Sequence, residues 1–317
     1  MTAPQPHETP EAGTVTDGPD RHYRSQLTCI GGGTGLAAAL AAARLIDPEP
    51  TALVSVVDDG GSSGRLVAER GGLPPGDLRK CLAALAPVDS PWRRLLDHRF
   101  VGGGSLGGHA LGNLILAALE DQEGDLASAA ARLAGIMGCR GRVVPVSLQP
   151  HVLVAETRSG VVRGQEAVNY SSNIRRIHLD PPDPKAHPDA VEAITRSSAV
   201  VIGPGSLFTS VIPPVLVPDV AAALASTSAR RVFVANLAPQ VAETRHLDLA
   251  GHVNAFLDHG GRADVVLFDP EAALGGAAGS PLPMVAAPML DPARPACHNP
   301  DRLAAALGGV LGGVRST

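Results

Sequence analysis

The sequence has 317 residues, a net charge of −5 and 44% apolar residues, enough for one large α/β domain with a sizeable core. An acidic chain without a basic stripe gives no reason to expect a nucleic-acid partner. Its four cysteines form no Cys-x-x-Cys pair, so neither zinc nor a disulfide framework is indicated and a reduced, cytoplasmic setting fits best. No uninterrupted apolar stretch reaches the roughly 20 residues of a membrane-spanning helix, so no membrane partner is expected.

Residues 1–24 are rich in Pro, Glu, Asp and Thr, and they lack the basic start and apolar run of a signal peptide. This composition predicts a disordered N-terminal tail. A single α/β domain is expected over 25–317. Its first half alternates strands with helices: strands at 27–30 and 52–57, and helices at 36–45, 66–70, 78–85, 92–100, 114–119 and 125–137.

The chain changes character at residue 142, where short strands replace the helices. Strands are expected over 142–148, 151–157, 160–167 and 175–179, with Ser159-Gly160 as a hairpin turn. This predicts a small β-rich insertion at about 142–180. The α/β alternation then resumes, with helices at 188–196, 220–226, 249–257 and 301–311, and strands at 199–202, 231–235 and, as the last strand, 264–268. The alternation predicts a Rossmann-like, doubly wound, mostly parallel sheet.

Two apolar strands run directly into glycine turns that open helices. The first turn holds Gly32, Gly33, Thr34 and Gly35. Glycine lets the backbone approach a ligand closely, and the helix that follows directs unpaired N–H groups toward an anion. Residues 33–38 also fit the dinucleotide pattern G-x-G-x-x-A, and Asp58 stands 20 residues further on, where a ribose-binding acid is expected. The sequence therefore predicts a phosphate site, and NAD(P) is an alternative ligand.

The second turn, residues 58–65, is the more distinctive one because so many different polar groups follow one another. Asp58 and Asp59 could hold Mg²⁺ or bind sugar hydroxyls. Ser62 and Ser63 offer hydroxyls, and Arg65 offers a guanidinium that matches phosphate oxygens. Helix capping by an Asp and an ion pair with Arg65 are the alternative readings.

Further candidates stand where other loops meet helices or strands end. Each has a structural alternative, such as a helix cap for Asp77 or a buried, hydrogen-bonded role for His109. The candidates are Asp77, Arg79, His109, Asn113, Gly205, Ser206 and Asn236.

Several of these stretches together resemble the YvcK family of gluconeogenesis factors, which is similar in fold to CofD, the 2-phospho-L-lactate transferase. The resemblance runs from about residue 27 to the C-terminus. It rests on six motifs: GGGTGL at 31–36, VVDDGGSSGRL at 56–66, PPGDLRKCLAAL at 74–85, GHALGNLILAAL at 108–119, GPGSLFTSVIP at 203–213 and NLAPQVAET at 236–244.

The resemblance implies a Rossmann-like cytoplasmic protein that binds a nucleotide-diphosphate sugar, notably UDP-N-acetylglucosamine. It implies a regulator of carbon metabolism, cell shape and cell-wall precursor synthesis, a role compatible with a regulatory protein partner and a homo-oligomer. The alternatives are a CofD-like, Mg²⁺-dependent transferase and an NAD(P)-binding protein. Lys80, Pro214 and Val241-Ala242 depart from the family's usual residues, and Lys80 is expected to add a phosphate contact.

Overall fold

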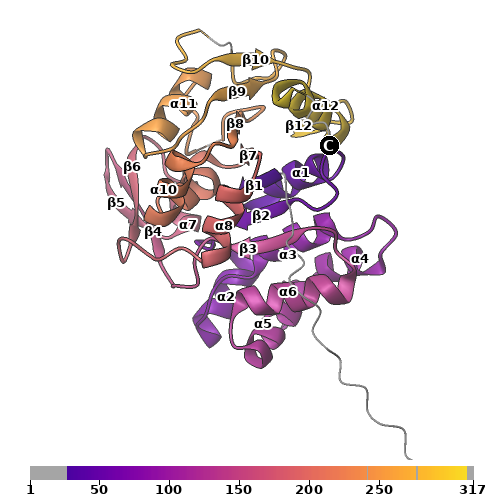
Figure 1. Ribbon diagram of the computed structural model, residues 1–317. Helices are drawn as coiled ribbons and strands as arrows, with labels where there is room; N and C mark the ends of the chain where they lie inside the picture. The colour runs from indigo at the N-terminus through magenta and orange to yellow at the C-terminus, as the bar shows by residue number, and fades with distance from the viewer. Residues whose placement is uncertain (1–26, 241, 276–277, 313–317) are drawn as a thin grey trace, which may run out of the picture.

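The computed structural model describes residues 27–240, 242–275 and 278–312, and the predicted tail at 1–24 lies outside these ranges (Figure 1). Its centre is a seven-stranded sheet in the order β10-β9-β8-β7-β1-β2-β3, in which every neighbouring pair is parallel. The strands are β1 Leu27–Gly31, β2 Thr51–Val54, β3 Arg142–Pro145, β7 Ala199–Ile202, β8 Arg230–Val234, β9 Val265–Phe268 and β10 Met284–Ala286. The predicted mostly parallel α/β sheet is therefore confirmed.

Helices cover both faces of this sheet, which explains why its strands are continuous apolar runs rather than alternating ones. In Figure 1, α1 (Gly33–Ala43) and α12 (Pro300–Leu311) lie to the right of the sheet, and α8 (Pro188–Arg196), α10 (Pro218–Ser226) and α11 (Leu249–Asp258) lie to the left. The remaining helical elements are α2 Gly61–Arg70, α3 Gly76–Leu85, α4 Pro91–Asp97, α5 Leu111–Glu123, α6 Leu126–Met137, α7 Gln165–Asn169, the π-helix η1 Leu207–Val211 and α9 Ile212–Val215.

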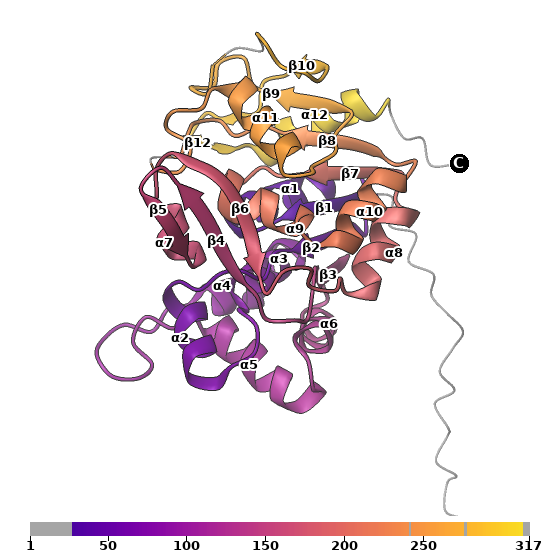
Figure 2. The same ribbon diagram turned by 90° about the vertical axis from the view of Figure 1, so that its left-hand side faces the viewer.

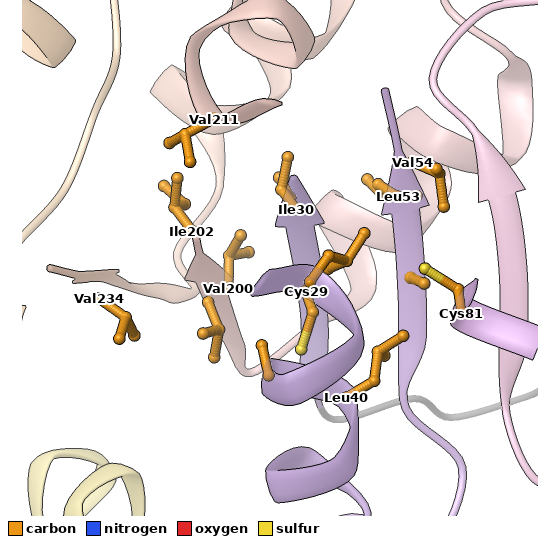
Figure 3. Packing of buried hydrophobic residues seen from close by; sticks show 14 of the residues in the cluster. Cys29, Ile30, Leu40, Leu53, Val54, Cys81, Val200, Ile202, Val211 and Val234 are labelled. Carbon is orange, nitrogen blue, oxygen red and sulfur yellow. The ribbon is translucent and has the colours of Figure 1, made fainter. Parts of the chain in front are cut away.

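The core forms where α1 and α3 pack on the central strands. Figure 3 shows Ile30 of β1 on the side of Leu53 of β2, and Cys29 of β1 on the side of Leu40 of α1. All four side chains are completely buried, and so is Cys81 of α3. Cys29 and Cys81 are therefore buried free thiols, and burial raises the pKa of Cys29 to about 12.

The β-rich insertion is smaller than predicted. Residues 142–145 form β3, which pairs with β2 at the edge of the main sheet and does not belong to the insertion. The insertion is a three-stranded antiparallel sheet, β5-β4-β6, that lies in front of the main sheet in Figure 2. Its elements are β4 Val152–Thr157, β5 Gly160–Arg163, α7 and β6 Ile174–Asp180. The predicted hairpin at Ser159-Gly160 is confirmed, but its second strand ends early because α7 begins at Gln165.

The expectation that 264–268 is the last strand is wrong. The chain continues through β10 and an antiparallel hairpin of β11 (Leu290–Asp291) and β12 (Arg294–His298). These strands are short and lie in a Pro- and Gly-rich stretch, so they carry almost no periodic signal. Their pairing partners come from the tertiary fold.

Within the described ranges, no single helix is long and apolar enough to cross a membrane. One sharply bent pair of short helical segments, 207–215 and 218–226, passes that test by length and composition together. Every side chain of the first segment is buried in the fold.

Candidate functional site

A cavity of about 480 Å³ opens at the carboxyl ends of the central strands. It lies where β1 and β7 are neighbours, the point at which the strand order reverses direction, and such switch points bind ligands in open α/β sheets. The lining residues come from seven segments: Gly32, Gly33, Thr34, Gly35 and Ala38; Asp58; Asp77 and Lys80; Gln165; Pro204, Gly205, Ser206 and Ser210; 236–240; and Ala296, Cys297 and His298.

The first glycine turn lines the cavity as predicted. Gly33 opens α1 in the left-handed region, at a φ of 65°. A Cβ on Gly35 would lie 2.7 Å from the carbonyl carbon of Pro204 and 2.8 Å from the Cα of Gly205. Glycine is needed at position 35 because two glycine turns pack backbone against backbone there. The N-terminus of α1 therefore faces the cavity with the turn at 203–206 beside it.

Asp77 and Lys80, on the first turn of α3, form an ion pair beside this glycine turn. Pro75 occupies the N-cap position of α3, so the interpretation of Asp77 as a cap is wrong. Its carboxylate instead accepts hydrogen bonds from the Gly33 amide at 2.7 Å and from Lys80 Nζ at 2.8 Å. Asp77 thus satisfies one of the free N–H groups of α1, and Lys80 places a positive charge at the cavity wall.

Asp58 is the second carboxylate in the cavity wall. Burial and the neighbouring Asp77 raise its pKa, against the hydrogen bonds that it accepts from Ser63 and from the Gly60 amide. Ser63 is buried and supports Asp58 rather than lining the cavity. Asp58 and Asp77 are the acidic groups that could face a divalent cation here. Among the residues that the structure describes, no group of three or more His, Cys, Asp or Glu side chains is arranged to hold a metal ion.

Asp59 and Arg65 are not among the residues that line the cavity. The carboxylate of Asp59 accepts hydrogen bonds from the amides of Gln165 at 3.0 Å and Glu166 at 2.7 Å, so it caps α7 and attaches the insertion to the second glycine turn. Arg65 is exposed and lies beside Gly108. A cation held jointly by Asp58 and Asp59 does not match this geometry.

Ser62, His109 and Asn113 meet in a buried cluster that joins α2 to the start of α5. Ser62 Oγ accepts hydrogen bonds from the Ala110 amide at 3.2 Å and from Asn113 Nδ2 at 3.0 Å. Its own hydrogen therefore goes to His109 Nδ1 at 3.1 Å, because a hydroxyl has one hydrogen to donate. Burial, with a smaller effect of Arg65, lowers the pKa of His109. None of the three lines the cavity, so their role is to support the second turn.

Arg79 is also structural. Its guanidinium is buried, forms an ion pair with Asp97 and donates to the carbonyl of Leu96 at 3.4 Å. These contacts tie α3 to α4 on the side away from the cavity.

The third turn is held by a reciprocal amide pair. The Gly205 amide donates to Asn236 Oδ1 at 3.0 Å, and Asn236 Nδ2 donates back to the Gly205 carbonyl at 2.7 Å. Asn236 and Gly205 line the cavity, yet their amide groups are used on each other. Ser206 is the residue of this turn whose hydroxyl stands at the cavity wall.

Sequence reasoning missed the wall formed by Ala296, Cys297 and His298. The only signal there was an unassigned cysteine. Burial lowers the pKa of His298 to about 4, so its ring is neutral at pH 7. Lys80 does line the cavity, whereas Pro214 is buried in α9 and Val241 lies outside the described residues.

The chain is similar to several known proteins over most of its length. The family model described as 2-phospho-L-lactate transferase CofD matches residues 27–275. A Mycobacterium tuberculosis protein named "Putative gluconeogenesis factor" is 43% identical over 307 residues, which cover 90% of each chain. The gluconeogenesis factor of Bacillus subtilis is 38% identical over 252 residues, covering 78% of this chain and 80% of that protein. A crystal structure of a UPF0052 family member from Bacillus halodurans is 33% identical, with a TM-score of 0.82 and coverage of 89% of this chain and 98% of that one.

Proposed function

This chain belongs to the CofD family and is similar to gluconeogenesis factors over most of its length, and from that premise we propose that its cavity binds a nucleotide-diphosphate sugar. The ligand is of the UDP-N-acetylglucosamine type. The protein acts as a cytoplasmic regulator of carbon metabolism, cell shape and cell-wall precursor synthesis.

The observation that carries this proposal is the close packing of two glycine turns at the switch point of the sheet. Gly35 and Pro204 bring the N-terminus of α1 and the turn at 203–206 to the same end of the cavity. Free amides, a helix dipole and the Lys80 ammonium converge there on the place where a diphosphate would lie.

The rest of the cavity suits the nucleoside and sugar. Its volume of about 480 Å³ falls in the range of small-molecule sites. Leu237, Ala238 and Pro239 add apolar side chains to the lining, and Gln240 follows them. A serine hydroxyl in contact with an imidazole is a pair that could act in catalysis. The buried Ser62–His109 contact lies outside the cavity, which favours ligand binding over turnover.

A CofD-like transferase is the second candidate, because Asp58 and Asp77 both line the cavity. The effect of Asp77 on the pKa of Asp58 shows that the two carboxylates lie close enough to interact. They are the residues that would hold Mg²⁺, which would supply charge neutralisation for a transferred phosphoryl group. The NAD(P) alternative rests on the G-x-G-x-x-A pattern at 33–38 and on Asp58, which lines the cavity after β2.

A thermal-shift screen separates these functions. The ligands are UDP-N-acetylglucosamine, UDP-glucose, GDP, NAD and NADPH, each with and without Mg²⁺. A ligand at about 100 times its dissociation constant adds about 2.7 kcal/mol, which is a shift of about 5 °C in a chain of this size. A shift with UDP-sugars alone, independent of metal, supports the regulator. A Mg²⁺-dependent shift with GDP supports the transferase, and a shift with NADPH alone supports the dinucleotide site.

The chain offers a matched pair of variants, because Lys80 and Lys185 are its only lysines. Lys80→Met is expected to weaken UDP-sugar binding about tenfold through the loss of one charge-assisted contact. Lys185→Met, on an exposed loop outside the cavity, should bind as the unchanged protein does. Equal affinities of the two variants would contradict the placement of the diphosphate.

Size-exclusion chromatography, with and without ligand, tests whether the protein forms a homo-oligomer. Co-purification under the same two conditions tests for a regulatory protein partner.

A further inference from the structure

Glu243 lies completely buried behind the third glycine turn, in the segment between β8 and α11. Its carboxyl group faces the hydroxyls of Ser206 and Thr209 and the amide of Leu207. None of these contacts reaches standard hydrogen-bond geometry, and Thr209 Oγ1 is also buried without a partner of that geometry. An ionised carboxylate without firm partners is costly in such a place, so the group is expected to hold its proton.

Ser206 lines the cavity and is also one of the groups beside the Glu243 carboxyl. Its hydroxyl makes no capping hydrogen bond to η1, which begins at the next residue. A hydroxyl donates one hydrogen and accepts up to two. The direction of that single hydrogen therefore decides whether Ser206 offers the cavity a donor or a lone pair.

We propose that Glu243 is a positioning residue that keeps the Ser206 hydroxyl directed as a donor into the cavity. When the ligand binds, the protonated carboxyl closes to hydrogen-bond distance and donates its hydrogen to Ser206 Oγ, and Ser206 donates its own hydrogen to a phosphate oxygen of the diphosphate. This inference rests on the proposed function and deepens it, because it assigns the third turn to the diphosphate.

The same geometry predicts what ionisation of Glu243 would do. A carboxylate only accepts hydrogen bonds, so it would draw the Ser206 hydrogen away from the cavity and leave a lone pair facing the anion. Its negative charge would also lie behind the phosphate site. Burial raises the pKa of Glu243 to about 8, which brings this change into an accessible pH range.

No titratable group on the elements around Glu243 shifts its pKa. The titratable groups there are Glu166 of α7, His259 beside Phe208 of η1, and Arg245 and His246 of its own segment. None of them is among the causes that shift the pKa of Glu243. The pH response of the turn is therefore expected to follow Glu243 itself.

Calorimetric titration with UDP-N-acetylglucosamine at pH 7 and pH 9 tests the proposal. The unchanged protein should bind about tenfold more weakly at pH 9, because the protonated fraction of a group with a pKa of about 8 falls from about 0.9 to about 0.1. Glu243→Gln, whose amide can still donate to Ser206, should keep the pH 7 affinity at both pH values. Ser206→Ala should bind weakly at both, and it keeps the test open if the Glu243 variant does not fold.

Cys297 provides the control, because it lines the cavity as Ser206 does. Cys297→Ser should retain the tenfold weakening. Loss of the pH response in this variant, or its persistence in Glu243→Gln, would overturn the proposal.

An infrared difference spectrum of the ligand-free proteins, unchanged minus Glu243→Gln, separates this inference from the proposed function. A neutral-carboxyl band at pH 7 that fades by pH 9 supports the inference. If UDP-sugars bind but the band is absent at pH 7, the inference alone fails. If the band is present but no UDP-sugar binds at either pH, the proposed function fails and the assignment of Ser206 to a diphosphate fails with it.

Discussion

Replacing Gly35 by alanine tests whether the contact between two glycine turns organises the cavity. The added Cβ would lie 2.7 Å from the carbonyl carbon of Pro204 and 2.8 Å from the Cα of Gly205, and closer still to the Pro204 oxygen. Ordinary carbon contacts need about 3.5–4 Å, so α1 and the turn at 203–206 must move apart by about 1 Å. Both partners are backbone, so no flexible side chain can give way.

The energy of this change combines two opposing effects. Overpacking of this kind costs about 1–3 kcal/mol, and alanine in a helix returns at most about 1 kcal/mol relative to glycine. Gly308 in α12 offers the matched control, because a Cβ there meets no atom within 4 Å. Gly308→Ala therefore gains the helix propensity alone. We expect Gly35→Ala to be less stable than Gly308→Ala by about 2 kcal/mol, or about 3–4 °C in Tm.

Thermal unfolding by circular dichroism, followed by titration with UDP-N-acetylglucosamine, measures both consequences. Gly35→Ala should lose affinity as well as stability, because the moved turn carries Ser206 away from the N-terminus of α1. Gly308→Ala should bind as the unchanged protein does. A Gly35→Ala variant as stable as Gly308→Ala would refute the packing argument, and normal ligand affinity in it would refute the claim that this contact shapes the site.

Three further predictions concern other parts of the site. Asp59→Ala should cost about 1 kcal/mol through loss of the α7 cap and speed hydrogen exchange in α7, with UDP-sugar affinity unchanged. Cys297 is exposed and should be alkylated first and be protected by a UDP-sugar, whereas Cys29 stays unreactive because burial raises its pKa to about 12. Burial lowers the pKa of His298 to about 4, so between pH 6.5 and pH 4 this imidazole binds a proton in the unfolded chain but not in the folded one. The free energy of unfolding should therefore fall by up to about 3 kcal/mol as the pH drops from 6.5 to 4.

Each of these predictions has a clear contrary result. Loss of UDP-sugar binding in Asp59→Ala would mean that the Asp59 carboxylate contacts the ligand. Mass spectrometry measures the rate of alkylation at each cysteine. Equal rates at Cys29 and Cys297 would contradict the burial of β1. Urea unfolding at pH 6.5 and pH 4 measures this loss of stability. His298→Gln should lose less stability at pH 4 than the unchanged protein, and an identical loss would rule out His298 as its source.

The sequence alone determined where the site lies in the fold. Short apolar strands that end in glycine, as at 27–31 and 199–205, predict parallel strands with ligand-facing turns at their carboxyl ends. This inference needs only local features, because burial on both faces and backbone freedom at glycine are written in consecutive residues. Gly32, Gly33, Thr34, Gly35, Asp58 and Ser206 were all identified in this way and all line the cavity.

The tertiary structure alone decided which polar groups face the ligand. Asp58 and Asp59 are adjacent in the sequence, yet one lines the cavity and the other caps α7, because side chains that follow one another along an extended turn point in different directions. Asp77 finds its partner 44 residues away at Gly33, a contact that no local pattern encodes. The cavity wall formed by Ala296, Cys297 and His298 likewise depends on where β12 packs. Side-chain roles at this site follow from long-range neighbours, which a single sequence does not specify.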